Sequence, residues 1–423
     1  MSDRLTVDFD HHDPNFHERR LDEWASLRSC PVAFNPNHGG FWVVSGYDEV
    51  QAVARGDGTV FSRRYEHEPV DGVDYVGIMG LPKMAEIHVL GSGLAEVSEE
   101  LHHPLRRALT PFVSVAATQA LQPDAERYAT WFLDEMIESG RGDLVKDLTA
   151  PVAGLITMDL VGLPRADWRY YVDVFTIAHE SAHDFDKPEV VERFFAAFTA
   201  MGQLLTEQLE DRRQNPRDDL LTTLVEFERE DGQRLDDMDL LGQLWFLIGG
   251  GLDTTSSTTA LALEHLARHP ELRQRLLDDP DLVPTAAEEY LRYFAVNETN
   301  SRTVREDTVL GGQQLRRGDH LLVSWFSANR DDTVFPDADQ VRFDRKPNPH
   351  LTFGTGPGKC LGMHIARMEL DVMLRAVLDR IPDFEVGDGG VRLAPPNPIL
   401  TVALSLPVRF TPGSRSGPTE RPF

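Results

Sequence analysis

A glycine-rich loop that ends in a cysteine is the part of this sequence whose residue types indicate chemistry most clearly. Residues 353–360 read Phe-Gly-Thr-Gly-Pro-Gly-Lys-Cys, and Leu361 and Gly362 follow. Glycine allows tight turns, so backbone N–H groups can point at the Cys360 sulfur, and a helix N-terminus would favour its thiolate. Such a thiolate is a metal ligand or a nucleophile. The flat, glycine-lined approach favours a large planar cofactor, for which a haem ligated by cysteine is the candidate.

A helix directly after the cysteine must hold this loop in place. Residues 361–380 contain no proline, and no glycine after Gly362. Four apolar residues fall on one face at helical spacing, namely Ile365, Met368, Val372 and Ala376. The pattern predicts a packed helix.

The longest helical pattern, residues 238–269, contains a segment that disfavours a helix. Residues 249–256 read Gly-Gly-Gly-Leu-Asp-Thr-Thr-Ser, and Pro270 ends the pattern. Each interior glycine destabilises a helix by about 1 kcal/mol relative to alanine, and the hydroxyls compete for backbone carbonyls. Such a segment indicates that something lies flat against the helix, or that a bulge opens a groove.

These two segments together resemble the cytochrome P-450 superfamily. The family pattern Phe-Gly-x-Gly-x-x-x-Cys-x-Gly is matched at Phe353, Gly354, Gly356, Cys360 and Gly362. The pattern Ala-x-x-Glu is matched at Ala366 and Glu369, and Gly-x-Asp-Thr at Gly251, Asp253 and Thr254, with Gly250 also typical.

The resemblance implies a role for each matched residue. Cys360 would ligate the iron of haem b, and Asp253 and Thr254 would deliver protons on the distal side, where oxygen is reduced. The residues expected to line the cofactor are Phe353, Gly354, Gly356, Gly250 and Gly251.

Three further residues resemble the family's contacts to the haem propionates. His102 and Arg106 match His-x-x-x-Arg, and Arg302 stands where relatives carry another propionate-binding arginine. Relatives often place a histidine two residues before the cysteine for the same purpose. This chain has Gly358 there, so we expect one propionate contact to be missing.

Glu289 and Arg292 match the family's Glu-x-x-Arg pair, which implies a buried structural ion pair. A third arginine usually joins the pair. Where it is expected the chain has Gln340, with Arg342 and Arg345 nearby, so either arginine could complete the network.

The expected fold is mainly α with small β-sheets, the cytochrome P-450 fold. A long central helix would lie over the haem, and the cysteine loop on the proximal side. We expect one catalytic domain over residues 1–410, with helices from about 102 to 269 and short strands within 39–46, 307–325 and 391–410. Residues 61–98 would form a long loop. Residues 411–423, rich in Pro, Ser and Gly, would form a disordered tail.

Composition restricts the possible partners. Among 423 residues, 42 Lys and Arg against 69 Asp and Glu give a net charge of −27, which repels nucleic acid and anionic membranes. There are two cysteines, Cys30 and Cys360, no apolar leader and no apolar run of spanning length. We therefore expect a soluble, cytoplasmic protein, and a monomer.

The function implied is monooxygenation: hydroxylation of a small organic molecule by O2, in bacterial specialised metabolism. The chain carries no flavin or iron–sulfur motif, so electrons from NAD(P)H must arrive through a ferredoxin and its reductase. Lys359, Arg367 and Arg107 would form a basic docking patch.

Three alternatives remain open from the sequence. The same haem chemistry could perform oxidative coupling, desaturation or C–C cleavage. A haem-binding sensor or carrier is the second, and a hydrolase with a cysteine nucleophile is the third.

Three polar residues before Arg302 are candidates for substrate recognition. Glu298, Thr299 and Asn300 lie where relatives line the pocket over the haem, and they would suit a substrate with an amine, amide or indole N–H. A buried carboxylate needs a donor. The alternative is therefore a structural Glu298 that bonds backbone N–H groups or Arg302.

Overall fold

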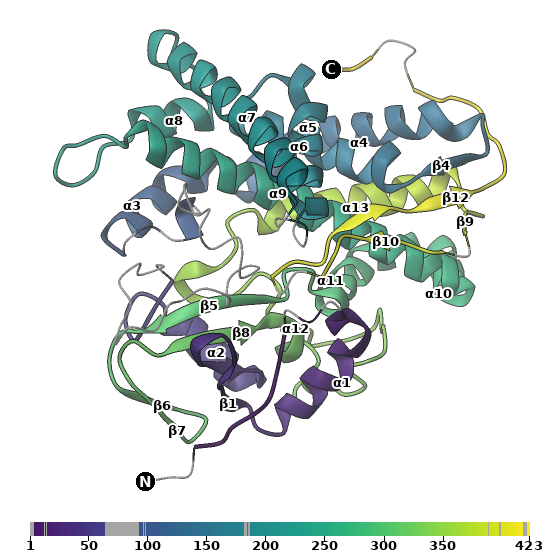
Figure 1. Cartoon of the computed structure of the whole chain (residues 1–423). Helices are drawn as coiled ribbons and strands as arrows, with labels where there is room; N and C mark the ends of the chain where they lie inside the picture. Colours follow the sequence, from purple (N-terminus) through teal and green to yellow (C-terminus); the bar gives the residue numbers. More distant parts are fainter. Residues whose placement is uncertain are drawn as a thin grey trace.

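A helical part and a β-rich part lie one above the other in the computed structural model of this chain (Figure 1). The structure describes residues 4–11, 13, 15–63, 93–95, 97, 99–181, 184, 187–387, 389–396, 399–417 and 421–423. Most of the long loop expected over residues 61–98 lies outside this range. Among the described residues, no helix is both long and apolar enough to cross a membrane.

The helices carry most of the structure. They are α1 (Phe16–Arg28), α2 (Tyr47–Arg55), α3 (Glu99–Leu109), α4 (Val115–Ile137), α5 (Ala150–Val161), α6 (Trp168–Ser181), α7 (Pro188–Gln214), α8 (Leu220–Glu226), α9 (Asp237–Arg268), α10 (Pro270–Asp278), α11 (Val283–Phe294), α12 (Trp325–Ala328) and α13 (Met363–Arg380). Short helical turns include η4 (Gly93–Ala95), η6 (Val145–Thr149) and η9 (Gly356–Gly358).

The strands form one larger sheet and three small ones. The larger sheet has the order β1-β2-β8-β5-β3, with β2 and β8 parallel and the other neighbours antiparallel. The small sheets are β4-β12-β9, β6-β7 and β10-β11. The strands are β1 (Val32–Asn35), β2 (Phe41–Val44), β3 (Phe61–Ser62), β4 (Arg141–Asp143), β5 (Thr299–Val304), β6 (Thr308–Leu310), β7 (Gln313–Leu315), β8 (His320–Ser324), β9 (Glu385–Val386), β10 (Arg392–Leu393), β11 (Ala403–Ser405) and β12 (Pro407–Arg409).

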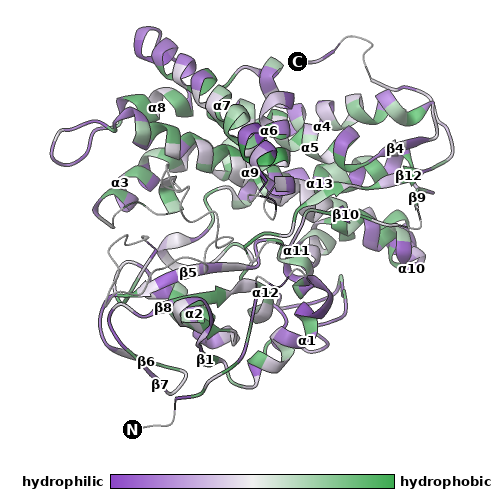
Figure 2. Cartoon of the chain, in the orientation of Figure 1, coloured by the Kyte–Doolittle hydropathy of each residue, from purple (hydrophilic) through white to green (hydrophobic). Residues whose placement is uncertain are grey.

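The long helix α9 forms the centre of the helical part. It begins after Asp236, whose side chain accepts a hydrogen bond from the Asp239 N–H at 2.8 Å and so satisfies one free donor of the first turn. It ends at Arg268, and Pro270 opens α10, where its missing N–H costs nothing. Figure 2 shows hydrophobic residues concentrated on α5, α9 and α13, as expected of helices that bury their faces against one another.

The predicted fold class is confirmed, whereas α1, β1 and β5 were not predicted. The strand β5 reads Thr-Asn-Ser-Arg-Thr-Val, which lacks an apolar alternation. It is a strand because β8 and β3 pair with its two edges. The region 391–410 holds the three short strands β10, β11 and β12, in agreement with the strands expected there.

The described part of the expected disordered tail makes specific contacts. The backbone N–H groups of Ser416 and Gly417 donate to the buried Asp134 carboxylate, and the Phe423 ring stacks on Phe132 with ring centroids 5.5 Å apart. Composition alone did not predict these contacts, because Pro, Ser and Gly content does not reveal a buried carboxylate that accepts backbone N–H groups.

Candidate active site

The three glycines in the middle of α9 have different surroundings. A Cβ at Gly249 would lie 2.5 Å from the Phe175 ring of α6, and one at Gly251 would lie 2.4 Å from Thr157 Oγ1 of α5. A Cβ at Gly250 would meet no atom of the described residues within 4 Å. Gly250 is therefore the glycine that leaves a face of α9 open. Gly251 allows α5 to approach closely, and its assignment to the cofactor stays a prediction.

Asp253 and Thr254 lie one turn beyond Gly250. The Thr254 hydroxyl donates to the Gly250 carbonyl at 2.9 Å, and the Asp253 carboxylate lies 2.8 Å from His179 Nε2 of α6. No bulge interrupts the helix here, since α9 runs continuously from Asp237 to Arg268. Burial disfavours protonation of His179, but the charge of Asp253 and the hydrogen bond to it prevail, so the pKa of His179 is raised.

The cysteine loop is anchored on α2. Gly354 and Gly356 have φ values of +64° and +69°, which side chains rarely adopt. A Cβ at Gly356 would lie 2.6 Å from the Ala54 carbonyl oxygen, so glycine lets the loop contact the end of α2. The Cys360 N–H then donates to the Phe353 carbonyl at 2.7 Å and closes the loop.

Cys360 follows this loop just before α13. Its side chain is exposed, yet protein surrounds the sulfur at longer range, and that burial raises the pKa of the thiol. The Gly362 N–H and the charges of Arg106, Arg367 and Lys359 act in the opposite direction. The Gly362 N–H thus favours the thiolate as expected, while burial of the sulfur opposes it and is the larger effect. A metal cation would supply the missing charge.

The helix α13, which follows Cys360, packs on α9 through Glu369. This side chain is 2% exposed and faces Thr255, the neighbour of Thr254. Burial raises the pKa of Glu369 well above its usual range, which favours the neutral form of the acid. The contact connects the Cys360 and Thr254 segments directly.

A basic cluster lies beside the cysteine loop. His102 on α3 is 1% exposed, and its burial together with the charges of Arg63, Arg106 and Arg302 lowers its pKa to about 3. The predicted His102, Arg106 and Arg302 are therefore brought together. Arg63 and its partner Asp57 were missed, because neither belongs to a recognisable pattern.

These features suit a planar cofactor with an iron centre and two carboxylates. Cys360 offers a sulfur, Gly250 an open helix face, and the cluster offers guanidinium groups. The Nδ1 atom of His102 is buried and has no hydrogen-bond partner among the residues that the structure describes, as expected of a group whose partner belongs to a ligand. The residues present therefore fit a haem with its propionates.

Comparison with known proteins gives the same result. The family model for cytochrome P450 matches residues 177–389. The chain is 33% identical to the mycinamicin IV hydroxylase/epoxidase of Micromonospora griseorubida over 82% of this chain and 83% of that protein. The chain belongs to the cytochrome P450 superfamily.

Solved P450 structures share its fold. The Mycobacterium marinum cytochrome P450 CYP268A2 in complex with pseudoionone has a TM-score of 0.85 at 27% identity, over 97% of this chain and 100% of that one. The polyketide synthase P450 PksS of Bacillus subtilis has a TM-score of 0.81 at 25% identity, over 95% of this chain and 100% of that one.

Membership of the superfamily establishes the cofactor and the class of reaction. This P450 binds haem b and is an oxygen-incorporating oxidoreductase. The alternatives of a haem sensor and of a hydrolase with a cysteine nucleophile are therefore set aside.

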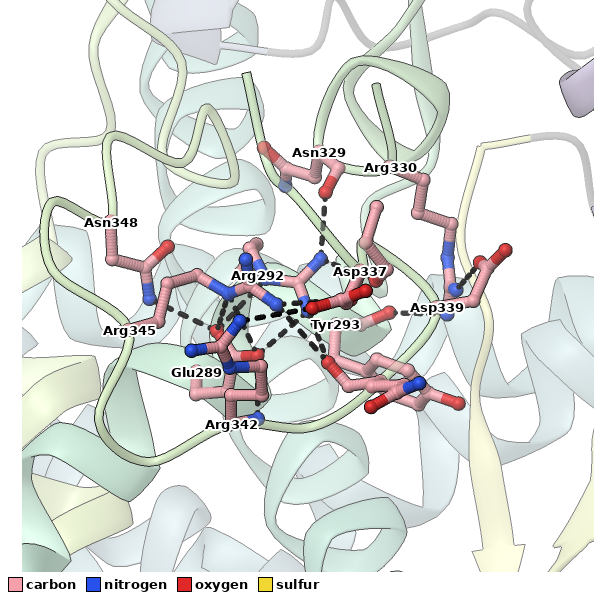
Figure 3. A network of polar contacts seen from close by, with 12 residues as sticks. Glu289, Arg292, Tyr293, Asn329, Arg330, Asp337, Asp339, Arg342, Arg345 and Asn348 are labelled. Atoms are coloured by element: carbon pink, nitrogen blue, oxygen red, sulfur yellow. Dashed lines mark hydrogen bonds and ion pairs between the residues drawn. The ribbon is translucent and has the colours of Figure 1, made fainter. Parts of the chain in front are cut away.

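The Glu289–Arg292 pair of this P450 is completed by Arg345. The Arg292 Nη2 and Arg345 Nε atoms lie 2.8 and 3.1 Å from Glu289 Oε1, and Glu289 and Arg292 are fully buried (Figure 3). Arg342 contributes only its backbone N–H to Glu289, and its side chain turns outward to Asp337. Both buried arginines also donate to carbonyls of residues 336–340, which fastens the irregular segment before the cysteine loop to α11.

The contacts of Glu298 favour the structural alternative over a role in substrate binding. Its buried carboxylate accepts a hydrogen bond from Arg20 Nη1 of α1 at 2.5 Å and another from Thr401. Glu298 is thus structural, although its partners are neither the backbone N–H groups nor the Arg302 that we considered. Asn300 accepts from Trp325 Nε1 at 2.7 Å, and Thr299 is buried within β5. The carboxylate that a cationic substrate would need is therefore already neutralised by Arg20.

The surface beside Cys360 carries part of the predicted basic patch. Lys359 is exposed and lines a hollow that also contains Arg367. Arg367 forms an ion pair with Glu288, with Nε and Oε1 2.5 Å apart, and its guanidinium lies 4.7 Å from the centroid of Phe353. Arg367 is thus neutralised by Glu288, whereas Lys359 forms no ion pair with the described residues. Lys359 therefore carries most of the free positive charge of this surface.

Proposed function

We propose that this P450 is a monooxygenase that hydroxylates a small organic molecule of bacterial specialised metabolism. The acid and the alcohol on α9 carry the proposal: Asp253 and Thr254 are adjacent, and the Thr254 hydroxyl bonds the carbonyl of Gly250, the glycine with the open face. A bound haem would supply the iron centre at which O2 is reduced and one oxygen atom is inserted into the substrate.

The residues around this position can control protons. The side chains of Asp253 and His179 are 17% and 16% exposed, so the pair lies at the boundary between solvent and interior. Thr254 lies next to it, with a hydroxyl that can accept a proton from one side and donate one to the other. The His179–Asp253 pair thus holds a proton at the entrance, and Thr254 passes it toward the open face of α9.

The electrons would come from NAD(P)H through a ferredoxin and a ferredoxin reductase. Supporting this, the exposed Lys359 directly precedes the proposed iron ligand and can attract an acidic electron donor to a protein that is strongly acidic overall. NAD(P)H is generated inside cells, so we place the enzyme in the cytoplasm. Oxidative coupling, desaturation and C–C cleavage would use the same residues. The oxygen-incorporation experiment described below distinguishes them from hydroxylation.

The similar proteins suggest the type of substrate. One is a mycinamicin IV hydroxylase/epoxidase and another is the nocardicin C N-oxygenase of Nocardia uniformis, 31% identical over 84% of this chain. Both names refer to oxygenation of a specialised metabolite. Steroid oxidation is a second candidate, because the chain is 35% identical to the steroid C26-monooxygenase of Mycolicibacterium smegmatis over 68% of this chain.

The test is oxygen incorporation by the reconstituted enzyme. Macrolide, peptide and steroid compounds are first screened for the spin-state shift of the haem spectrum. Any binder is then incubated with ferredoxin, reductase, NADPH and 18O2, and its products are weighed by mass spectrometry. A product heavier by one 18O atom supports hydroxylation. A product that has lost two hydrogens without gaining 18O would replace hydroxylation with desaturation or coupling.

A further inference from the structure

A buried ion pair that the family patterns do not include lies beside the cysteine loop. Arg63 directly follows β3 and is 7% exposed, and its Nη2 atom lies 2.7 Å from Oδ2 of Asp57, whose side chain is fully buried. Arg302 of β5 approaches the other oxygen of the same carboxylate, with its Nε atom 3.6 Å from Oδ1. Asp57 therefore holds two guanidinium groups, one from the residue after β3 and one from β5 of the same sheet.

The cluster around Asp57 has more positive than negative charge. Arg63, Arg106 and Arg302 all act on His102, which their charges and burial keep neutral, and Asp57 is the carboxylate paired with the cluster. Among the residues that the structure describes, three guanidinium groups and one carboxylate leave two positive charges in a largely buried region. Burying unbalanced charge is costly, so this composition favours a ligand that brings two negative charges.

Two atoms of the cluster identify where that ligand binds. Arg63 Nη1 and His102 Nδ1 are buried and have no hydrogen-bond partner among the described residues. Buried donors of this kind are nearly always satisfied in native proteins. A ligand carboxylate would satisfy both of them and would match the flat, two-pronged geometry of a guanidinium.

The cysteine loop itself touches the cluster at Gly358. A Cβ there would lie 2.7 Å from Asp57 Oδ2 and 3.8 Å from Arg302 Nη2. Asp57 therefore occupies the space that any side chain at position 358 would need. The same contact places the cluster within two residues of Cys360, at the edge of the haem site.

We propose that Arg63, oriented by Asp57, is a haem-anchoring residue of this P450 that binds a propionate carboxylate of the cofactor. Gly358 has no side chain to bind a propionate, so one propionate contact was expected to be missing. The guanidinium of Arg63, which comes from the β-rich part, supplies this contact instead. Arg63 touches the cofactor, and Asp57 acts through Arg63 and Arg302 as a positioning residue.

Haem retention tests the proposal without using turnover. Purified ferric Arg63→Gln protein is mixed with excess apomyoglobin, and the rate of haem transfer is followed by absorbance. Loss of one charge-assisted hydrogen bond predicts transfer about 10- to 100-fold faster than in the unmodified protein. Arg63→Lys, which keeps the charge, should fall in between. Arg305→Gln is the matched control, because Arg305 is exposed and bonds the carbonyl of Gly58, next to Asp57.

A modified cofactor separates anchoring from damage to the fold. Apoprotein is reconstituted with haem dimethyl ester, in which both carboxylates are blocked. If Arg63 binds a propionate, Arg63→Gln should accelerate the loss of haem but leave the loss of the ester nearly unchanged. Equal acceleration with both cofactors, or no acceleration with haem, would overturn the proposal.

Asp57→Asn provides a second readout if Arg63→Gln does not fold. Removing a buried negative charge beside the haem should shift the iron midpoint potential to a more positive value, because the ferrous form carries less positive charge. An unchanged potential in a variant that retains its haem would exclude Asp57 from the site. The proposal is independent of proton delivery, since coupling assays on Asp253 and Thr254 can fail while haem retention still depends on Arg63.

Discussion

The imidazole of His179 in α6 lies 2.8 Å from the carboxylate of Asp253 in the middle of α9. The interaction joins two helices that are separated by α7 and α8 in the chain, and it involves the acid expected to deliver protons. A histidine changes charge near neutral pH, so the strength of this connection depends on pH.

We expect His179 to stabilise the fold in a pH-dependent manner. Its pKa is raised above the usual value of about 6.5, so its contribution is fully present below that value and is lost as pH rises through the raised pKa. His179→Gln, which keeps a donor but cannot titrate, should therefore lower the melting temperature more at pH 6 than at pH 9. An equal loss at both values would show that the ion pair adds nothing.

Asp253 and Thr254 should have separable effects on turnover. Asp253→Asn should slow product formation by roughly 100-fold, within the range for lost acid–base catalysis. Thr254→Ala removes the hydroxyl that bonds Gly250 and should divert NAD(P)H into hydrogen peroxide. For both variants, the measured quantities are the rates of product formation, of peroxide formation and of NAD(P)H consumption. Full coupling in both variants would mean that another route carries the protons.

Cys360 should determine the spectrum of the reduced, CO-bound protein. Cys360→Ser should abolish the red-shifted Soret band typical of thiolate ligation, whereas Cys30→Ser should keep it. The control is well matched, because Cys30 is a half-buried cysteine whose sulfur lies 3.6 Å from the Ser29 hydroxyl. Retention of the thiolate band in Cys360→Ser would contradict the assignment of the ligand.

Two arginines near Glu289 should differ in their contributions to stability. Arg345→Ala removes one of the two arginines that neutralise the buried Glu289 carboxylate. It should lower the free energy of unfolding by about 3–5 kcal/mol. Arg342→Ala removes a side chain that pairs only with exposed carboxylates and should cost less than about 1 kcal/mol. Urea unfolding followed by circular dichroism measures both. Similar losses would refute the structural distinction between them.

Lys359 should control reduction by an acidic ferredoxin. Lys359→Glu should slow reduction several-fold at low ionic strength, and the difference should shrink as salt screens the charges. Lys146→Glu is the control, because Lys146 is also exposed but lies on η6, away from the cysteine loop. Stopped-flow reduction at several salt concentrations gives the answer. If the two variants behave alike, Lys359 does not take part in docking.

The sequence by itself determined the fold class and the segments that carry the chemistry. Cys360, Asp253 and Thr254 lie in short patterns, because their geometry depends on glycines and on helical spacing within a few residues. The Glu289–Arg292 pair was likewise predictable, since residues three apart meet on one helix face.

Only the tertiary structure decided which residues from distant segments meet. Arg345 and not Arg342 joins Glu289, Arg20 neutralises Glu298, and Arg63 and Asp57 join His102 and Arg302, each across a large separation in the chain. The three glycines of α9 are alike in the sequence, yet the helices packed on two of them leave the third one open. These outcomes depend on how helices and strands pack in space, and local patterns carry no information about that packing.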